Sequence, residues 1–360
     1  MPQISALNHN TISRKVQEAA NKLENHIRAC DFKSGDRYIT TEEASKMLGI
    51  SLMTTQRAMN LLSQNDILER RPKAGTFIGS GFKNEIQTTH VHFCIPENTQ
   101  IHGNTRNTLW EQIDGMQSIL GTLSAHFHFV PRQSLIYVQD IIQKSSPLGL
   151  LNAVVLILAS REMRDYFNQS GIPTVVEGGV EPDLKNLCWI QWDQVQVGQL
   201  LAEHVISRGH HRIASIMRDI WSIGEHQLHD GINDTIAAAQ LPSNTLRIRS
   251  APNEEKAISE LVRGLLKEKN PPTAFICRSE FQANCTASVV REAHLTEKIE
   301  IVHCNAPAKP EKNRYTCTVP ELSMFDFGKV IGEMFKCMIS GKILQHRGRE
   351  IPVRIKLPAS

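Results

Sequence analysis

The sequence predicts an α/β fold in two parts: a small helical domain that ends in a hairpin, and a two-lobed domain of doubly wound parallel sheets. Within residues 1–80, three helical patterns precede two short strand patterns. From residue 90 onward, strand-like and helical stretches alternate, which is typical of parallel sheets covered by helices. The alternating part is long enough for two sheets, so we expect a ligand site at the carboxyl ends of their strands.

The composition is typical of a globular protein from a reducing compartment. The chain has 360 residues, 41% hydrophobic and 21% charged, which is too long for one ordinary core. No apolar run approaches the ~20 residues that span a bilayer, and residues 1–10 lack a signal-peptide pattern. The eight cysteines include no Cys-x-x-Cys pair. We therefore expect a cytoplasmic protein without membrane contact, zinc site or disulfides.

The net charge of +3 lies in the N-terminal part of the chain. Residues 1–80 contain 11 Lys and Arg against 8 Asp and Glu, and the remaining residues are balanced. A basic excess on a short domain favours a polyanionic partner.

Each element of the N-terminal domain has its own sequence signal. Thr40 and Glu43 form a capping-box pattern that begins a second helix, and Gly49 ends it. A third helix follows, and then two short strands around residues 72–75. The first helix is expected over residues 13–28, where apolar side chains recur at helical spacing: Val16, Ala19, Ala20, Leu23 and Ile27.

The third helix and the hairpin have the side chains that a winged helix-turn-helix uses to bind DNA. Hydroxyl, amide and guanidinium groups reach base edges and phosphates, and basic side chains on a wing bind the flanking phosphates. Gln56 can read adenine through its amide, and Arg57 can supply a charged contact. The candidate DNA-binding residues are Thr41, Ser51, Thr54, Thr55, Gln56, Arg57, Arg71, Lys73 and Gly75.

The spacing of these residues matches a known pattern: Gly35, Thr40-Thr41, Leu48-Gly49-Ile50-Ser51, Thr54, Arg57-Ala58-Met59 and Gly75-Thr76-Phe77-Ile78. On this frame, residues 13–80 resemble the DNA-binding domain of the GntR family of bacterial regulators, which implies DNA binding. Three positions where that family has arginine are Glu42, Leu52 and Gln56 here. Each lost arginine removes a charge-assisted contact, so we expect weaker, more salt-sensitive or differently specific binding.

Residues 81–89 are polar and aperiodic, and we interpret them as a linker to a domain over residues 90–360. The expected strands of that domain cover residues 91–95, 125–130, 153–158, 173–176, 212–217, 246–248, 273–277 and 299–303. The expected helices cover residues 110–123, 135–144, 163–170, 191–208, 225–239, 254–268, 281–293 and 325–339.

The larger domain also contains a recurring set of motifs: Asp193-Gln194, Gly198, Leu201-Ala202-Glu203-His204, Arg208-Gly209-His210-His211-Arg212-Ile213-Ala214, Asp230-Gly231-Ile232, Pro272-Thr273-Ala274-Phe275-Ile276-Cys277, Thr318-Val319-Pro320 and Gly328. On these motifs, residues 90–360 resemble the ligand-binding core of the LacI family, which has the type I fold of periplasmic sugar-binding proteins. The resemblance implies a small-molecule effector, a sugar or polyol, in the cleft between two lobes.

Three polar positions of that family's sugar site differ in this chain. The family's arginine before a helix glycine is Leu228, its Asn-Asp pair is Ser279-Glu280, and its aspartate after the next strand is Asn305. Without the arginine fork, the site binds a different ligand class or binds little. Asp193 has an alternative role as a helix cap, and Trp221 as packing. The candidate ligand-binding residues are Ser160, Asp193, Trp221, Glu280 and Asn305.

These features together predict a ligand-responsive transcriptional regulator, a repressor of sugar or related catabolic genes that binds double-stranded DNA as a homodimer. The alternative is a cytoplasmic solute sensor or binding protein without DNA activity. The sequence contains no nucleophile elbow, phosphate-binding loop or metal-ligand cluster, so we expect neither an enzyme nor a cofactor. The side chains of the adjacent His210 and His211 diverge, and we interpret them as turn residues rather than metal ligands.

Overall fold

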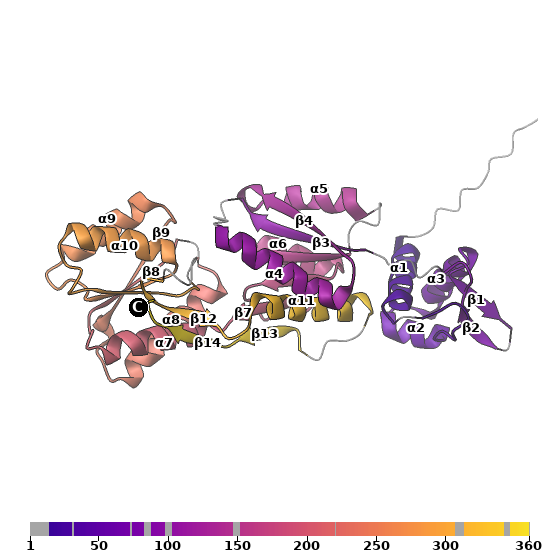
Figure 1. The fold of residues 1–360 in the computed structure, drawn as a ribbon. Helices are drawn as coiled ribbons and strands as arrows, with labels where there is room; N and C mark the ends of the chain where they lie inside the picture. Colours follow the sequence, from indigo (N-terminus) through magenta and orange to yellow (C-terminus); the bar gives the residue numbers. More distant parts are fainter. Residues whose placement is uncertain are drawn as a thin grey trace, which may run out of the picture.

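The chain is described by a computed structural model over residues 14–30, 32–72, 74–82, 88–97, 103–146, 152–219, 221–306, 313–341 and 346–359. Three bodies follow one another along the molecule (Figure 1): the N-terminal domain, a middle N-lobe and a distal C-lobe. The N-terminal domain contains α1 (Arg14–Ala29), α2 (Thr41–Leu48), α3 (Leu52–Gln64), β1 (Leu68–Arg71) and β2 (Gly75–Ile78).

The N-terminal domain has one core between its three helices and the β1–β2 hairpin. The predicted apolar stripe of α1 lies in this core together with Ala44, Met59 and Leu62. The capping box of α2 is closed, because Thr40 N donates to Glu43 Oε2 (2.7 Å) and Glu43 N donates to Thr40 Oγ1 (3.2 Å). Phe82 also joins the core, so the domain extends past the expected boundary at residue 80.

The N-lobe is built on a six-stranded parallel sheet with the order β13-β7-β6-β5-β3-β4. Its strands are β3 (Thr89–Pro96), β4 (Leu123–Val130), β5 (Ala153–Ile157), β6 (Thr174–Glu177), β7 (Cys188–Trp192) and β13 (Gly348–Ile351). Its helices are α4 (Gly103–Leu120), η1 (Pro131–Gln133), α5 (Leu135–Ser145), α6 (Arg161–Ser170) and α11 (Met324–Ile339). Helices α4 and α11 cover one face of the sheet, and α5 and α6 cover the other.

The C-lobe has a second six-stranded sheet, with the order β14-β12-β11-β10-β8-β9. Its strands are β8 (Ile213–Arg218), β9 (Leu246–Ala251), β10 (Ala274–Cys277), β11 (Glu300–His303), β12 (Thr316–Pro320) and the antiparallel β14 (Val353–Lys356). Its helices are α7 (Gln194–Ser207), α8 (Ile223–Ala238), η3 (Ser243–Thr245), α9 (Glu255–Leu266) and α10 (Glu280–Glu292). Helices α7 and α8 cover one face, and α9 and α10 cover the other.

The chain crosses between the lobes three times: from β7 to α7, from β12 to α11 and from β13 to β14. The crossings are hydrogen-bonded to one another, because Asp193 N donates to Ile351 O and Glu321 N donates to Pro352 O, both at 2.9 Å. The lobes also touch beside the crossings, where Gln191 Nε2 donates to Gln227 Oε1 at 2.9 Å. The carboxyl ends of both sets of parallel strands therefore lie at the junction of the lobes.

Glycines allow the closest helix contacts. A Cβ at Gly231 of α8 would lie 2.1 Å from Val195 O, and a Cβ at Gly198 of α7 would lie 2.3 Å from Leu228 O. The same arrangement recurs between α4 and α11, where a Cβ at Gly115 or Gly328 would lie 2.0 Å from a backbone oxygen of the other helix. These helix pairs can approach each other only because both partners lack a side chain at the crossing.

The structure corrects several expected elements. The helix expected over residues 191–208 begins only at Gln194, because Asp193 caps it, and Trp189, Ile190 and Trp192 form β7 instead. Helix α4 ends at Leu120, before residue 123, because Gly121 takes φ +77° and β4 begins at Leu123. The short strands β12, β13 and β14 were not expected. Across the described ranges, no helix combines the length and apolar character that crossing a bilayer requires.

Candidate functional site

The outer face of α3 is the first candidate site. Buried side chains of Thr55, Ala58, Met59 and Leu62 fix the rotation of the helix in the core. We call the exposed side of α3 its outer face. It consists of Met53, Gln56, Arg57 and Asn60, which recur at helical spacing. An apolar side chain, two amides and a guanidinium thus project from one side of the helix.

A chain of hydrogen bonds joins the outer face of α3 to α2 and to the hairpin. Thr41 Oγ1 donates to Gln56 Oε1 at 3.3 Å, and Arg70 Nη2 donates to Thr41 Oγ1 at 3.4 Å. Thr41 therefore orients the Gln56 amide rather than standing free at the start of α2. Sequence reasoning missed Arg70, although it stands beside Arg71 in the basic hairpin.

The hairpin provides a wing whose basic residues are partly engaged. Arg71 donates from Nε and Nη2 to Glu69 Oε1 and Oε2, at 3.0 and 2.9 Å, and its guanidinium carbon lies 4.4 Å from the Phe77 ring centroid. Gly75 takes φ +115° at the turn of the wing, with Arg37 beside it, so its role is conformational. Lys73, the other wing residue expected to bind phosphate, lies outside the described residues.

The hydroxyl residues of α3 have mainly structural roles. Ser51 is the N-cap, and its Oγ accepts from Thr54 N at 3.3 Å. Thr55 is fully buried, and its Oγ1 donates to Ser51 O at 3.1 Å, so the expectation that it binds phosphate is wrong. The physical reason is the helical period, which places position 55 on the same side as the core residues of α3.

A buried ionic cluster forms the second candidate site, at the carboxyl edge of the C-lobe sheet. Glu225 of α8 is fully buried, and its Oε1 lies 2.9 Å from Arg278 Nε and 3.2 Å from Arg218 Nε. Its Oε2 accepts from Ser222 N at 3.1 Å and from the Ser222 hydroxyl. Arg278 Nη1 in turn donates to Asn305 Oδ1 at 3.3 Å. Arg218 ends β8, Arg278 directly follows β10, and Asn305 lies two residues after β11; these three parallel strands are neighbours in the sheet.

The electrostatics of the cluster follow from two cations beside one anion. Burial by itself would raise the pKa of Glu225, but Arg278, Arg218 and Ser222 outweigh it and lower that pKa to about 2. Burial, and then repulsion by Arg278, lower the pKa of Arg218 to about 10. Glu225 and Arg218 are therefore both charged at neutral pH. The Arg218 side chain keeps 33% of its surface exposed, so the cluster reaches the outside of the lobe.

The five residues expected to bind an effector occupy different places. Ser160 caps α6 of the N-lobe, and Asp193 caps α7, where its Oδ1 accepts from Gln196 N at 2.8 Å. Trp221 Nε1 donates to Ser250 Oγ at 2.9 Å, and its ring packs against two histidines of α8. Glu280 is the first residue of α10. Asn305 contacts the buried cluster through Arg278, while Leu228 is fully buried in the C-lobe core.

The cluster residues had a signal that sequence reasoning missed. Arg218 and Arg278 each end a run of buried apolar strand residues, and Ser222 and Glu225 form a capping-box pattern. A charged residue directly after a buried parallel strand is placed at the edge where ligands bind. The three charges are distant in sequence, so only the fold brings them together.

Two other clusters have structural explanations. The imidazoles stack along β3 and β4: His90, His92, His126 and His128. Burial, and to a smaller extent the neighbouring histidines, lower the pKa of His128 to about 4. His210 Nε2 lies 3.0 Å from Glu300 Oε2, which supports the interpretation of His210 as structural. Over the described part of the chain, no group of three or more His, Cys, Asp or Glu side chains has a metal-binding arrangement.

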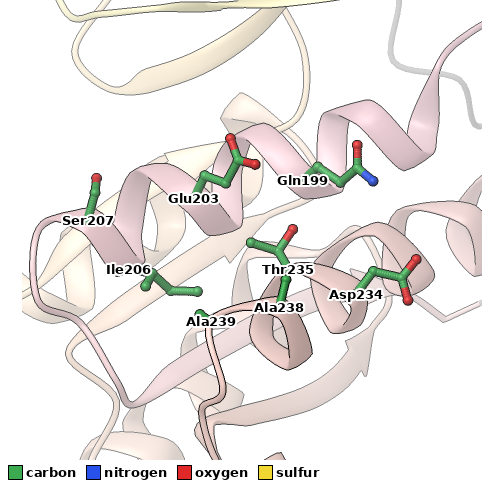
Figure 2. A pocket seen from close by; sticks show the side chains of 8 residues that line it. All are labelled: Gln199, Glu203, Ile206, Ser207, Asp234, Thr235, Ala238 and Ala239. Carbon is green, nitrogen blue, oxygen red and sulfur yellow. The ribbon is translucent and has the colours of Figure 1, made fainter.

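Figure 2 shows a shallow hollow between α7 and α8, with Gln199 and Glu203 on one helix and Asp234 and Thr235 on the other. A second hollow includes Arg208 and Glu300, close to the amino end of β11. Neither is lined by residues of the buried cluster. We therefore place neither hollow in the candidate effector site.

The fold and the two sites define a class of protein: a winged helix-turn-helix joined to a two-lobed periplasmic-binding-protein-like domain. Residues 15–78 match the family described as bacterial regulatory proteins, gntR family. Residues 158–304 match the family described as periplasmic binding proteins and sugar binding domain of LacI family. The chain thus combines a GntR-type helix-turn-helix region with a LacI-type ligand-binding region, as the sequence motifs predicted. A comparison with curated proteins finds no match.

Solved structures confirm the architecture of the larger domain. A LacI-family regulatory protein from Chloroflexus aggregans superimposes with a TM-score of 0.65 at 16% identity, covering 76% of this chain and 99% of that one. A LacI-family regulator from Enterococcus faecium with bound ribose gives 0.60 at 16% identity, covering 75% and 97%. A cellobiose complex of the regulator CelR gives 0.61 at 14% identity, covering 90% and 100%. At these identities the likeness establishes the fold.

Proposed function

We propose that this protein is a transcriptional regulator, a repressor that binds operator DNA through its N-terminal domain and a small-molecule effector between its lobes. The single observation that carries the proposal is the joining of a GntR-type helix-turn-helix to a LacI-type ligand-binding domain in one chain. A regulator needs both parts, whereas a solute sensor without DNA activity has no use for the first. Such a regulator acts on DNA in the cytoplasm and is not an enzyme.

Contacts in the N-terminal domain support DNA binding. The outer face of α3 carries Gln56 and Arg57, and the hydrogen bonds through Thr41 connect this face to the wing at Arg70. We infer that α3 enters the major groove while the wing binds phosphates beside it. Two copies of the domain in a homodimer would bind the two half-sites of a palindromic operator.

Contacts in the C-lobe support an effector site at the junction of the lobes. Leu228 replaces the arginine of the family pattern. Arg218 and Arg278 instead provide two guanidiniums at the carboxyl edge of the C-lobe sheet. Both use Nε for Glu225, and Arg278 Nη1 also donates to Asn305, so the other Nη groups are the proposed donors to oxygen atoms of a ligand. Asn305 lies against them, and Ser160, Asp193, Trp221 and Glu280 remain proposed contributors. The bound ribose and cellobiose of two structural neighbours favour a sugar-like effector.

Replacing Arg57 with Ala is expected to weaken operator binding about 10- to 100-fold, because one charge-assisted contact to DNA is lost. The measurement is fluorescence anisotropy of the full chain on DNA from upstream of its own gene, titrated with salt. Arg291→Ala is the matched control, since Arg291 is an exposed arginine at the end of α10 in the C-lobe. The proposal is contradicted if the wild-type chain shows no sequence-selective binding even at low salt.

A further inference from the structure

Two exposed large apolar side chains of the N-terminal domain lie together at the start of α3. Leu52 is 52% exposed and Met53 is 67% exposed, and both belong to the first turn of the helix. Within the described residues of this domain, no other large apolar side chain is as exposed as these two. Folding of the domain alone does not require them there, because the core is complete without them.

Met53 shares the outer face of α3 with polar groups that suit DNA. Gln56, Arg57 and Asn60 follow it at helical spacing and are all exposed. Arg70 and Arg71 of the wing lie on the neighbouring hairpin, next to α2 and Phe77 respectively. The amides and the guanidinium beside Met53 suit the hydrogen-bonding base edges and the negative potential of a DNA groove.

The major groove offers one apolar group, the C5-methyl of thymine, and apolar side chains discriminate thymine by contacting it. Gln56 has the complementary preference, since its amide can accept from N6 of adenine and donate to N7. The Gln56 Oε1 bond to Thr41 fixes the amide and still leaves a lone pair on that oxygen. The side chains of Met53 and Gln56 are thus both chemically suited to features of A·T pairs.

We propose that Met53, with Leu52 beside it, is a specificity-determining residue that contacts thymine methyl groups in the operator. The inference rests on the proposed DNA-binding function and adds the base class that α3 selects. The side chain that replaces a family arginine at position 52 thus changes the type of contact from charge-assisted to apolar.

Single thymidines of the bound upstream fragment are replaced with 2′-deoxyuridine, which keeps base pairing and removes only the methyl group. At one or two positions of each half-site, this single replacement is expected to weaken DNA binding by the wild-type chain about 3- to 10-fold. That loss of affinity corresponds to one buried methyl contact. Met53→Ala is expected to weaken binding to the thymidine fragment by a similar factor. It should also abolish the penalty for deoxyuridine at the same positions, since the contact is already lost.

Ile136→Ala is the matched control, because Ile136 is an apolar side chain of the N-lobe that is 79% exposed. It should leave both the affinity and the deoxyuridine penalty unchanged, while Met53→Leu should retain both. The inference is overturned if deoxyuridine is tolerated at every position, or if Met53→Ala keeps the full penalty. It is likewise overturned if Met53→Ala changes only the sedimentation coefficient, which indicates a protein contact. Absence of any sequence-selective binding would instead contradict the proposed function.

Discussion

Replacing Glu225 with Ala is expected to lower the free energy of unfolding of the C-lobe by about 3–5 kcal/mol, the usual cost of breaking a buried ion pair. Two guanidiniums, Arg218 and Arg278, would face each other without the carboxylate that now lies 3.2 and 2.9 Å from their Nε atoms. The capping box of α8 would be lost as well. Urea denaturation followed by circular dichroism measures the change.

Glu292→Ala is the matched control, because Glu292 forms an exposed ion pair with Arg263. The Glu292 side chain is 56% exposed and the Arg263 side chain 47%. An exposed pair contributes less than about 1 kcal/mol, so this variant should unfold almost as the wild type does. If both variants lost the same stability, burial would not explain the importance of Glu225.

The Glu225 carboxylate also makes the stability of the C-lobe depend on pH. Its pKa of about 2 lies below the ordinary value of 4.5, so its stabilising contribution is complete above pH 4.5 and is lost as the pH falls through 2. The Glu225→Ala variant lacks this contribution at every pH. The difference in stability between wild type and variant should therefore shrink as the pH decreases through this window.

Replacing Gly231 with Ala is expected to destabilise the C-lobe by about 3 kcal/mol through overpacking. The new Cβ would lie 2.1 Å from Val195 O, a backbone atom of α7 that cannot move aside like a flexible side chain. Helices α7 and α8 would have to separate, which would open the core around Leu228 and Ile232. Thermal and urea unfolding measure the loss.

Gly264→Ala is the matched control on α9, where a new Cβ would meet nothing within 4 Å. Alanine favours the helix more than glycine does, so this variant should gain about 0.5–1 kcal/mol. The opposite signs of the two substitutions test whether close packing, rather than helix preference, dictates glycine at position 231.

Periodic sequence patterns predicted most of the fold, because these patterns arise from residues that are close together in the chain. The stripe of α1, the capping box of Thr40 and Glu43, and the alternation of strands and helices all come from neighbouring residues. The elements that were missed depend on distant pairing. Strand β7 pairs with β6 and β13, and β14 pairs with β12, so their short sequences gain stability only from the completed sheets.

The candidate sites were only partly predictable for the same reason. Gln56 and Arg57 lie on the outer face of α3, as helical spacing allows, whereas Thr55 was misplaced although it shares the buried side with Ala58. The exposed Met53 was not considered, because an apolar residue in a helix is usually assigned to a core. The cluster of Arg218, Glu225 and Arg278 required the strand order of the C-lobe, which no local pattern reveals.

The linkage between effector and DNA tests the proposed function most directly. Operator affinity of the full chain should be measured by anisotropy with and without each member of a panel of neutral sugars, polyols and sugar phosphates. A compound that binds the lobes is expected to change the operator Kd about 10-fold or more, and operator DNA should change the affinity for that compound by the same factor. An effector that binds tightly between the lobes and leaves the operator Kd unchanged would contradict the proposal.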